Sequence, residues 1–143
     1  MIEIRECRRA DFEQILTLLH QLWPKKSLDR ERLRKAYDRR LRSLDQFHIC
    51  ATIDADVIGF CSLTVKSSLS QQGYLGYIDE LVVDEQHRGR GVGTLLLHRI
   101  TTIAAKNGCR GIELDSYLHR KGAHSFYEKH GFTKRAHLYA KEI

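Results

Sequence analysis

A loop rich in glycine and arginine lies between an apolar run, Leu81-Val82-Val83, and an apolar-periodic helix. The loop contains Arg88, Gly89, Arg90, Gly91 and Gly93. The first N–H groups of the helix, those of Val92, Gly93 and Thr94, have no partner within the helix, and the helix dipole favours negative charge there. Glycine lets the backbone approach a ligand closely and adopt positive φ, and arginine adds charge. The pattern predicts a site for a phosphate or pyrophosphate.

Two common phosphate-binding motifs do not fit this loop. A P-loop has Lys followed by Ser or Thr after its last glycine, whereas this chain has Gly93-Thr94-Leu95. The glycine spacing also differs from the dinucleotide-binding fingerprint, and the loop does not belong to an early β-α-β unit. Nucleotide triphosphatase and dinucleotide-binding activities are therefore disfavoured.

Two carboxylates, Asp79 and Glu80, interrupt the apolar strand that leads into this loop. A carboxylate in a central strand is costly unless it faces a cleft or a partner. Because side chains alternate along a strand, we expect one carboxylate on each face of the sheet. Only one of them would then reach a substrate amine as a base, and the sequence leaves the choice open. Either could also attract a cationic amine without acting as a base.

Tyr127 is the candidate proton donor. A phenol has a pKa of about 10, so it stays protonated at neutral pH and can donate a proton to a leaving thiolate. Judged from its spacing alone, Tyr127 beside Phe126 would be an ordinary core aromatic residue.

The loop and the tyrosine together resemble a known family. The pattern Arg88-x-x-Gly91-x-Gly93 resembles the acyl-CoA pyrophosphate loop of the GNAT superfamily of N-acyltransferases, and Ser125–Phe132 resembles its second signature. The resemblance implies transfer of an acetyl group from acetyl-CoA to a primary amine, with Tyr127 facing the CoA sulfur. It also implies that main-chain groups of Leu81 and Val83 hold the acetyl and pantetheine portions. Val82 and the loop residues through Thr94 complete the expected cofactor site.

One position departs from the common family pattern. Many GNAT members carry Asn seven residues before the matching tyrosine, where this chain has Arg120. The segment from Arg120 to Tyr127 resembles a subset of the family that includes aminoalkylphosphonate N-acetyltransferases. We therefore expect Arg120 in the cofactor site, without the asparagine-type contact.

The predicted elements follow the order β-α-α-β-β-β-α-β-α-β-β. Apolar alternation predicts strands near 2–5, 47–53, 57–65, 74–83 and 111–116 and a terminal hairpin over 132 and 137–140, and apolar helical spacing predicts helices over 11–23, 29–44, 92–105 and 123–130. The GNAT fold has this order, so residues 1–143 are expected to form one domain of mixed α/β class. Its twisted, mostly antiparallel sheet would carry helices on both faces. In the family the fourth and fifth strands splay apart and the pantetheine arm lies between them.

Composition excludes several classes of protein. The net charge is +6, and nine Lys and Arg residues lie between positions 25 and 42. Tyr37 is the only aromatic residue in this run, so the run predicts a solvated helix face, and no nucleic-acid partner is expected. The sequence has no membrane span and no signal-peptide character, and its four cysteines lack paired spacing, which favours a reducing cytoplasm. His119, His124 and His130 lack the spacing of a metal-binding helix pair, so no metal is expected.

The acceptor amine stays open at this level. Aminoalkylphosphonates, aminoglycosides or polyamines, and protein amines are all compatible with the motifs, and a small primary amine is favoured. The competing class is a non-catalytic acetyl-CoA-binding regulatory module, which would keep the glycine loop and lose the acid. Members of the family are often homodimers, and terminal strands offer exposed edges for such an interface.

Overall fold

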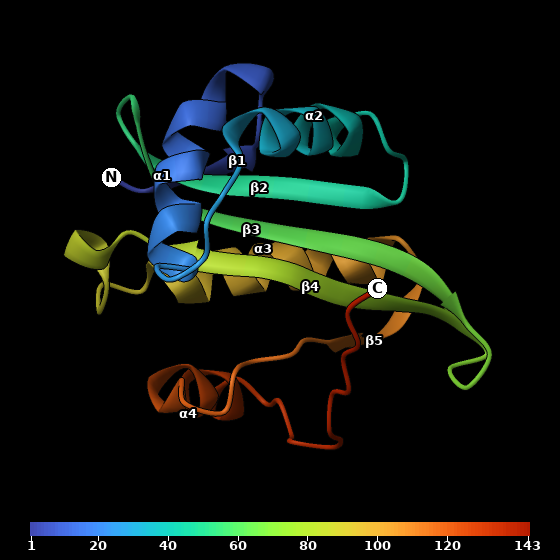
Figure 1. Cartoon of the computed structure of the whole chain (residues 1–143). Coiled ribbons are helices and arrows are strands. Elements are labelled where there is room, and N and C mark those ends of the chain that lie inside the picture. The colour runs from blue at the N-terminus through green and yellow to red at the C-terminus, as the bar shows by residue number, and fades with distance from the viewer. The chain divides into compact units, whose positions relative to one another are not determined.

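The computed structural model describes all 143 residues, and the chain divides into two compact units, Met1–Glu113 and Leu114–Ile143 (Figure 1). The single domain over residues 1–143 stays a prediction. The first unit contains β1 (Glu3–Glu6), a 3-10 turn (Arg9–Asp11), α1 (Phe12–Leu22), α2 (Arg30–Leu41), β2 (Gln46–Ile53), β3 (Asp56–Ser68), β4 (Gly73–Val83), a second 3-10 turn (Glu85–His87), α3 (Val92–Lys106) and β5 (Cys109–Glu113). The second unit contains α4 (Lys121–Lys129).

The sheet of the first unit has the strand order β1-β2-β3-β4-β5. The first four strands are antiparallel neighbours, and β5 lies parallel to β4. The register of β4 with β5 runs only from Tyr74 opposite Cys109 to Tyr77 opposite Glu113. Beyond Tyr77, β4 therefore has a strand neighbour on one side alone. The predicted mixed sheet is observed, and the pairing of β4 with β5 stops where β5 itself ends at Glu113.

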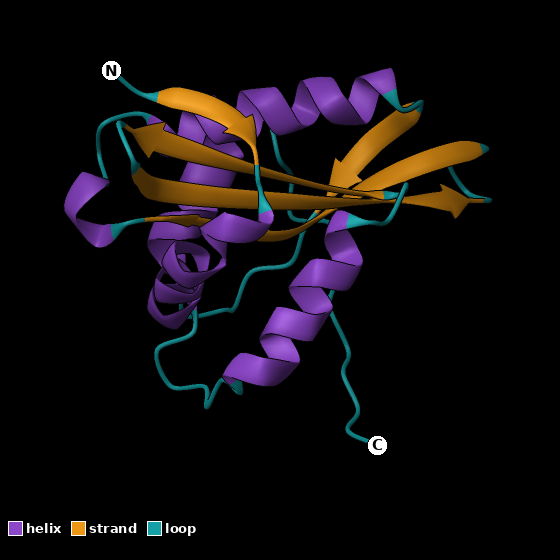
Figure 2. Ribbon diagram, turned by 90° about the horizontal axis from the view of Figure 1, so that it is seen from above, coloured by secondary structure: helices purple, strands orange, loops and turns teal.

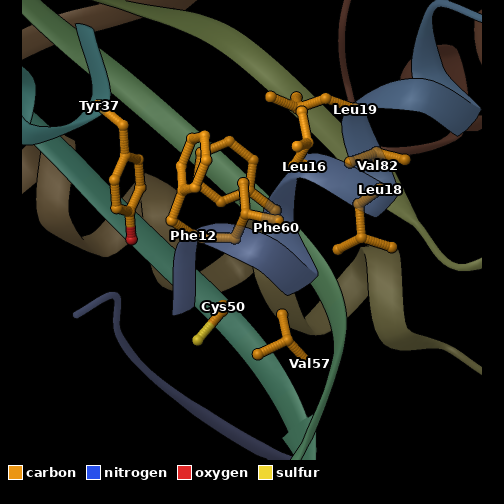
Figure 3. Close-up of a cluster of buried hydrophobic side chains, with 10 residues drawn as sticks. Phe12, Leu16, Leu18, Leu19, Tyr37, Cys50, Val57, Phe60 and Val82 are labelled. Carbon is orange, nitrogen blue, oxygen red and sulfur yellow. The ribbon is translucent and has the colours of Figure 1, made fainter. Parts of the chain in front are cut away.

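Helices cover both faces of this sheet (Figure 2). Phe60 of β3 belongs to the core cluster under α1 and α2, whereas a side chain at Gly59 would meet Val92 and Leu96 of α3. Since neighbouring strand residues point to opposite faces, α3 lies on the face opposite α1 and α2. Figure 3 shows how Phe12, Leu16 and Leu19 of α1 and Tyr37 of α2 point toward the sheet.

Local sequence signals account for where the first two helices begin and end. Asp29 caps α2, because its carboxylate accepts a hydrogen bond of 3.0 Å from the Arg32 N–H. The first helix ends at Leu22, just before Pro24, whose ring cannot continue a helix. The second helix ends at Leu41, three residues earlier than predicted, with Arg42 as its C-cap.

The predicted terminal hairpin is wrong. Residues 133–143 contain no strand, and the Leu138 and Tyr139 side chains are exposed. The apolar alternation there is short and flanked by charged residues, and an isolated two-stranded hairpin is only marginally stable in water.

A buried ion pair fixes the chain before α1. Arg5 donates to both carboxylate oxygens of Asp11, at 2.8 and 2.9 Å, and the Arg8 N–H donates at 2.7 Å. The Asp11 side chain is 8% exposed. The bonds from Arg5 and Arg8 hold the pKa of Asp11 below its ordinary value.

We expect Asp11→Asn to destabilise the protein by about 2 kcal/mol at neutral pH, because it weakens the charge-assisted hydrogen bonds from Arg5 and from the Arg8 N–H. The stabilisation is present above the unfolded-state pKa of Asp11 and is lost as the pH falls through the lower folded-state pKa. Urea unfolding across a pH series measures both effects. Glu31→Gln breaks an exposed pair with Arg30 and should cost less than about 1 kcal/mol. Equal losses of unfolding free energy in Asp11→Asn and Glu31→Gln would show that the Arg5–Asp11 pair stabilises the fold no more than an exposed ion pair does.

Candidate functional site

The glycine loop has an open backbone conformation. Gly89 and Gly91 have φ values of 77° and 81°, and a Cβ added at either position would meet nothing within 4 Å. Both positions therefore favour glycine for conformation and leave space beside the backbone. Gly93 lies inside α3 without a positive φ, so only two of the three glycines have the predicted conformation.

The N-terminus of α3 faces this open loop. Gly91 is its N-cap residue and has no side chain to cap the helix, and the first turn contains no acidic residue. The buried Val92 anchors the helix, while Arg88 and Arg90 are exposed beside its start. The Arg88 Nε–H donates to the Val83 carbonyl at 3.0 Å, which connects the loop to the end of β4. A pyrophosphate group fits this site, because the backbone N–H groups at the start of α3 can donate to it. Arg88 and Arg90 supply positive charge, and the loop leaves open space beside its backbone.

Gln21 of α1 anchors the start of this loop. Its amide donates to the Asp84 carboxylate and accepts from the Glu85 N–H, each at 2.9 Å. Asp84 also contacts the His87 ring at 2.8 Å. The bond from Gln21, followed by that from His87, lowers the pKa of the Asp84 carboxyl. Sequence reasoning missed Gln21, because a glutamine on a helix 63 residues away carries no motif signal.

We expect Gln21→Ala to raise the Kd for acetyl-CoA about fivefold, since two anchoring bonds at the loop are lost. Calorimetric titration measures the change. Gln14→Ala is the matched control, because Gln14 lies on the same helix and bonds the backbone at Ala55 and Val57 instead. A similar loss of affinity in both variants would show that the effect comes from α1 as a whole.

A bulge in β4 brings the two candidate carboxylates to one side of the sheet. Ser62 of β3 pairs with Glu80 and Leu63 pairs with Ile78, so Asp79 is the extra residue. Arg40 Nη2 lies 2.9 Å from a Glu80 oxygen and 3.7 Å from an Asp79 oxygen. The expectation of one carboxylate on each face is therefore wrong, because the bulge interrupts strict alternation.

The two carboxylates differ in their surroundings. Glu80 accepts from Ser62 Oγ at 2.5 Å and from Arg40 at 2.9 Å, and its side chain is 13% exposed. Asp79 accepts from Thr64 Oγ1 at 2.6 Å and is 25% exposed. Burial raises the pKa of Asp79 above its ordinary value, and the nearby Glu80 charge adds to this. Sequence reasoning missed Arg40, Ser62 and Thr64, because only the folded sheet brings them to β4.

A small pocket lies between α1, α2 and the sheet, beside the ion pair of Arg40 with Glu80. Arg40, His48 and Glu80 contribute ionisable side chains to its lining, and the other lining residues are aliphatic or aromatic, including Tyr37 and Trp23. His48 is 6% exposed. Burial, followed by the positive charge of Arg40, lowers the pKa of His48 to about 4. The imidazole is therefore neutral at physiological pH.

The second unit carries the other candidate residues. Tyr127 lies on α4, where its ring packs edge-on against Phe126 at 5.5 Å and Phe132 at 5.7 Å between centroids. Arg120 is the N-cap residue of the same helix. His124 and His130 bond the carbonyls of Tyr117 and Phe126, respectively.

The structure contains no group of three or more His, Cys, Asp or Glu residues that could hold a metal ion. None of its helices combines the length and apolar character needed to cross a bilayer.

Comparison with protein-family models identifies the group to which this chain is related. Residues 4–132 match the acetyltransferase (GNAT) family, and this range includes both the glycine loop and α4. The chain belongs to the GNAT family. Members of this family use acetyl-CoA, and the open N-terminus of α3 has the donors and space that its pyrophosphate requires.

Two curated relatives of this GNAT chain are similar over nearly its full length. Aminoalkylphosphonate N-acetyltransferase from Salmonella typhimurium is 29% identical over 141 residues, covering 99% of this chain and 91% of the relative. Glucosamine 6-phosphate N-acetyltransferase from Trypanosoma brucei brucei is 30% identical over 138 residues, covering 95% and 90%. A crystal structure of a Trypanosoma brucei acetyltransferase superposes with a TM-score of 0.82 at 26% identity, covering all of both chains. The chain is thus an enzyme of the N-acetyltransferase class.

Proposed function

We propose that this GNAT enzyme transfers the acetyl group of acetyl-CoA to the primary amine of a small molecule by direct attack. The observation that carries the proposal is the pair Asp79 and Glu80, which lie on one side of β4 beside Arg40 and shortly before the open glycine loop. Acetyl transfer to an amine needs a group that accepts the amine proton and a site that holds the anionic cofactor. One continuous segment of this chain carries a candidate for each.

The cofactor would be held by the segment from Leu81 to Thr94 and by Arg120. Backbone N–H groups at the start of α3, with Arg88 and Arg90, would bind the pyrophosphate. Main-chain groups of Leu81 and Val83 would hold the acetyl and pantetheine portions, which is supported by the strand-free side of β4 beyond Tyr77. The family resemblance assigns Val82 and Arg120 to the same site.

Asp79 is the better candidate for the base. Its higher pKa increases its affinity for a proton, whereas Glu80 is engaged by Arg40 and Ser62. In the reaction the amine nitrogen attacks the thioester carbonyl, and its proton passes to Asp79. The tetrahedral intermediate then collapses, the C–S bond breaks, and Tyr127 donates a proton to the leaving thiolate. The role of Tyr127 rests on the family resemblance and on the chemistry of a phenol.

The names of the two curated relatives support a small acceptor. One is named for an aminoalkylphosphonate and the other for glucosamine 6-phosphate, and both compounds are small primary amines. The small pocket that Glu80 helps to line supports the same class over a protein amine. We further infer a cytoplasmic enzyme, in keeping with its four free cysteines, and a homodimer is compatible with the family.

Calorimetric titration with acetyl-CoA, followed by a thiol-release assay over an amine library, tests the proposal. Binding followed by thiol release with one class of small amine is the expected result. Binding without release from any small amine would contradict it, and would favour a protein amine or a non-catalytic regulatory module. Absence of binding would contradict the assignment of the glycine loop.

We expect Asp79→Asn to lower kcat/KM about 30-fold at pH 7, because the amine then loses its positioned base. The base acts only when ionised, so wild-type activity should fall as the pH drops through a pKa above that of an ordinary Asp. Glu80→Gln removes a neighbouring negative charge that raises this pKa, so its acid limb should move to lower pH. Full pH profiles of kcat/KM measure both effects. An unchanged profile in Asp79→Asn would exclude Asp79 as the base.

A further inference from the structure

Two hydroxyl groups of β3 hold the two candidate carboxylates of β4. Ser62 and Thr64 are two residues apart, so their side chains leave the sheet on the same face. Ser62 Oγ donates to Glu80 at 2.5 Å, and Thr64 Oγ1 donates to Asp79 at 2.6 Å. Both bonds are short, as is usual for a hydroxyl that donates to a charged oxygen. Each carboxylate therefore has a donor of its own on the neighbouring strand.

The contacts of Asp79 fall on one of its two carboxylate oxygens. Oδ2 accepts from Thr64 at 2.6 Å and lies 3.7 Å from Arg40 Nη2. No group of the protein bonds the other oxygen, Oδ1, and this atom is not buried. The Asp79 side chain is 25% exposed. Oδ1 is therefore the oxygen that a proton from a bound amine can reach.

Thr64 is itself held by the next strand of the sheet. Gln46 of β2 pairs with Thr64 in the register of the two strands, and its side-chain amide donates to Thr64 Oγ1 at 3.4 Å. A threonine hydroxyl has one proton to donate, and an ionised carboxylate can only accept. The Thr64 hydroxyl therefore accepts from Gln46 and donates its proton to Asp79, which connects the carboxylate to both strands.

We propose that Thr64 is a positioning residue for acetyl transfer: its hydroxyl holds Oδ2 of Asp79 and leaves Oδ1 to receive the proton of the attacking amine. The inference rests on the proposed role of Asp79 as the base. Thr64 contacts neither the amine nor the cofactor in this scheme, and it acts through Asp79 alone. Gln46 supports it from β2, more weakly because its bond to Thr64 is longer.

Thr64 also influences the pH at which Asp79 ionises. Burial raises the pKa of Asp79, the bond from Thr64 lowers it, the charge of Glu80 raises it and that of Arg40 lowers it. The thiol of Cys61, which the Asp79 charge also reaches, stays neutral because burial raises its pKa. Removal of the Thr64 hydroxyl should therefore raise the pKa of Asp79. Since the base acts only when ionised, the acid limb of the activity profile should then move to higher pH.

Thr64→Val and Thr64→Ser separate positioning from packing. Valine keeps the shape of threonine without its hydroxyl and suits a strand, whereas serine keeps the hydroxyl without the methyl group. We expect Thr64→Val to lower kcat/KM about tenfold and to move its acid limb to higher pH, while Thr64→Ser keeps most of the activity and the wild-type limb. A larger loss in Thr64→Ser than in Thr64→Val would overturn the inference, because packing rather than the hydroxyl would then matter.

Thr101→Val is the matched control for loss of a threonine hydroxyl. Thr101 donates to the Leu97 carbonyl within α3 at 2.7 Å, away from both carboxylates. Its variant should keep the wild-type kcat/KM and acid limb, and both valine variants should keep the wild-type Kd for acetyl-CoA. An equal fall of kcat/KM in Thr64→Val and Thr101→Val would overturn the inference.

Carboxyl ¹³C resonances distinguish failure of this inference from failure of the proposed function. The Asp79 signal, identified by its loss in Asp79→Asn, is followed through a pH titration in wild type and in Thr64→Val. A higher pKa of this signal in Thr64→Val supports the hold of Thr64 on Asp79. If the wild-type acid limb does not follow the same titration, only the proposed role of Asp79 as the base is contradicted. An unchanged titration in Thr64→Val would overturn the inference and leave the proposed function intact.

Discussion

Gly91→Asp is expected to abolish measurable binding of acetyl-CoA. The new carboxylate would stand at the N-cap of α3, in open space beside the backbone where we place the pyrophosphate. Juxtaposed like charges cost several kcal/mol, which corresponds to a rise in Kd of roughly 100-fold or more. Calorimetric titration of the folded variant with acetyl-CoA measures the loss.

Gly91→Asn is the matched control for this variant. Asparagine is nearly the same size as aspartate and tolerates a similar positive φ, so the two variants share the strain at φ 81° and differ in charge. We expect the neutral variant to bind acetyl-CoA at least tenfold more tightly than the charged one. Wild-type affinity in Gly91→Asp would remove the glycine loop from the cofactor site.

Tyr127→Phe is expected to lower kcat by roughly 10²- to 10⁴-fold, the range typical of a lost general acid. The Kd for acetyl-CoA should change by less than about twofold, because the variant loses only the hydroxyl group that acts in the transition state. Phenylalanine keeps the ring that packs against Phe126 and Phe132, so the stability of α4 should be preserved. Steady-state thiol release with the best amine, together with calorimetry, measures the two quantities.

Tyr139→Phe controls for the chemistry of removing a tyrosine hydroxyl. Tyr139 lies in the strand-free C-terminal segment and is 90% exposed, so its variant should keep wild-type kcat. Unchanged turnover in Tyr127→Phe would show that another donor, such as water, protonates the thiolate. Loss of acetyl-CoA affinity in place of turnover would assign Tyr127 to binding instead of acid catalysis.

The sequence by itself determined the parts of this protein that depend on local chemistry. The glycine loop, the start of α3 at Val92 and the cap at Asp29 each follow from residues a few positions apart, and the structure has all three. Apolar runs likewise predicted the central strands β2 and β3, which are buried over most of their length because helices cover both faces of the sheet. The terminal hairpin failed because short apolar alternation without a partner strand cannot define a strand.

Tertiary structure alone decided how the candidate acceptor site is arranged. Arg40 comes from a helix whose run of basic residues predicts a solvated face, and no sequence pattern pairs it with Asp79 and Glu80 of β4, which it contacts. The bulge opposite Ser62 and Leu63 turns both carboxylates to one side of the sheet, although strict alternation predicts opposite sides. The fold also buries His48 of β2 and leaves its Nε2 atom without a hydrogen-bond partner, which no local pattern in the sequence predicts. The physical reason is common to these cases: long-range pairing and packing bring the partners together, and no local pattern encodes a contact between distant segments.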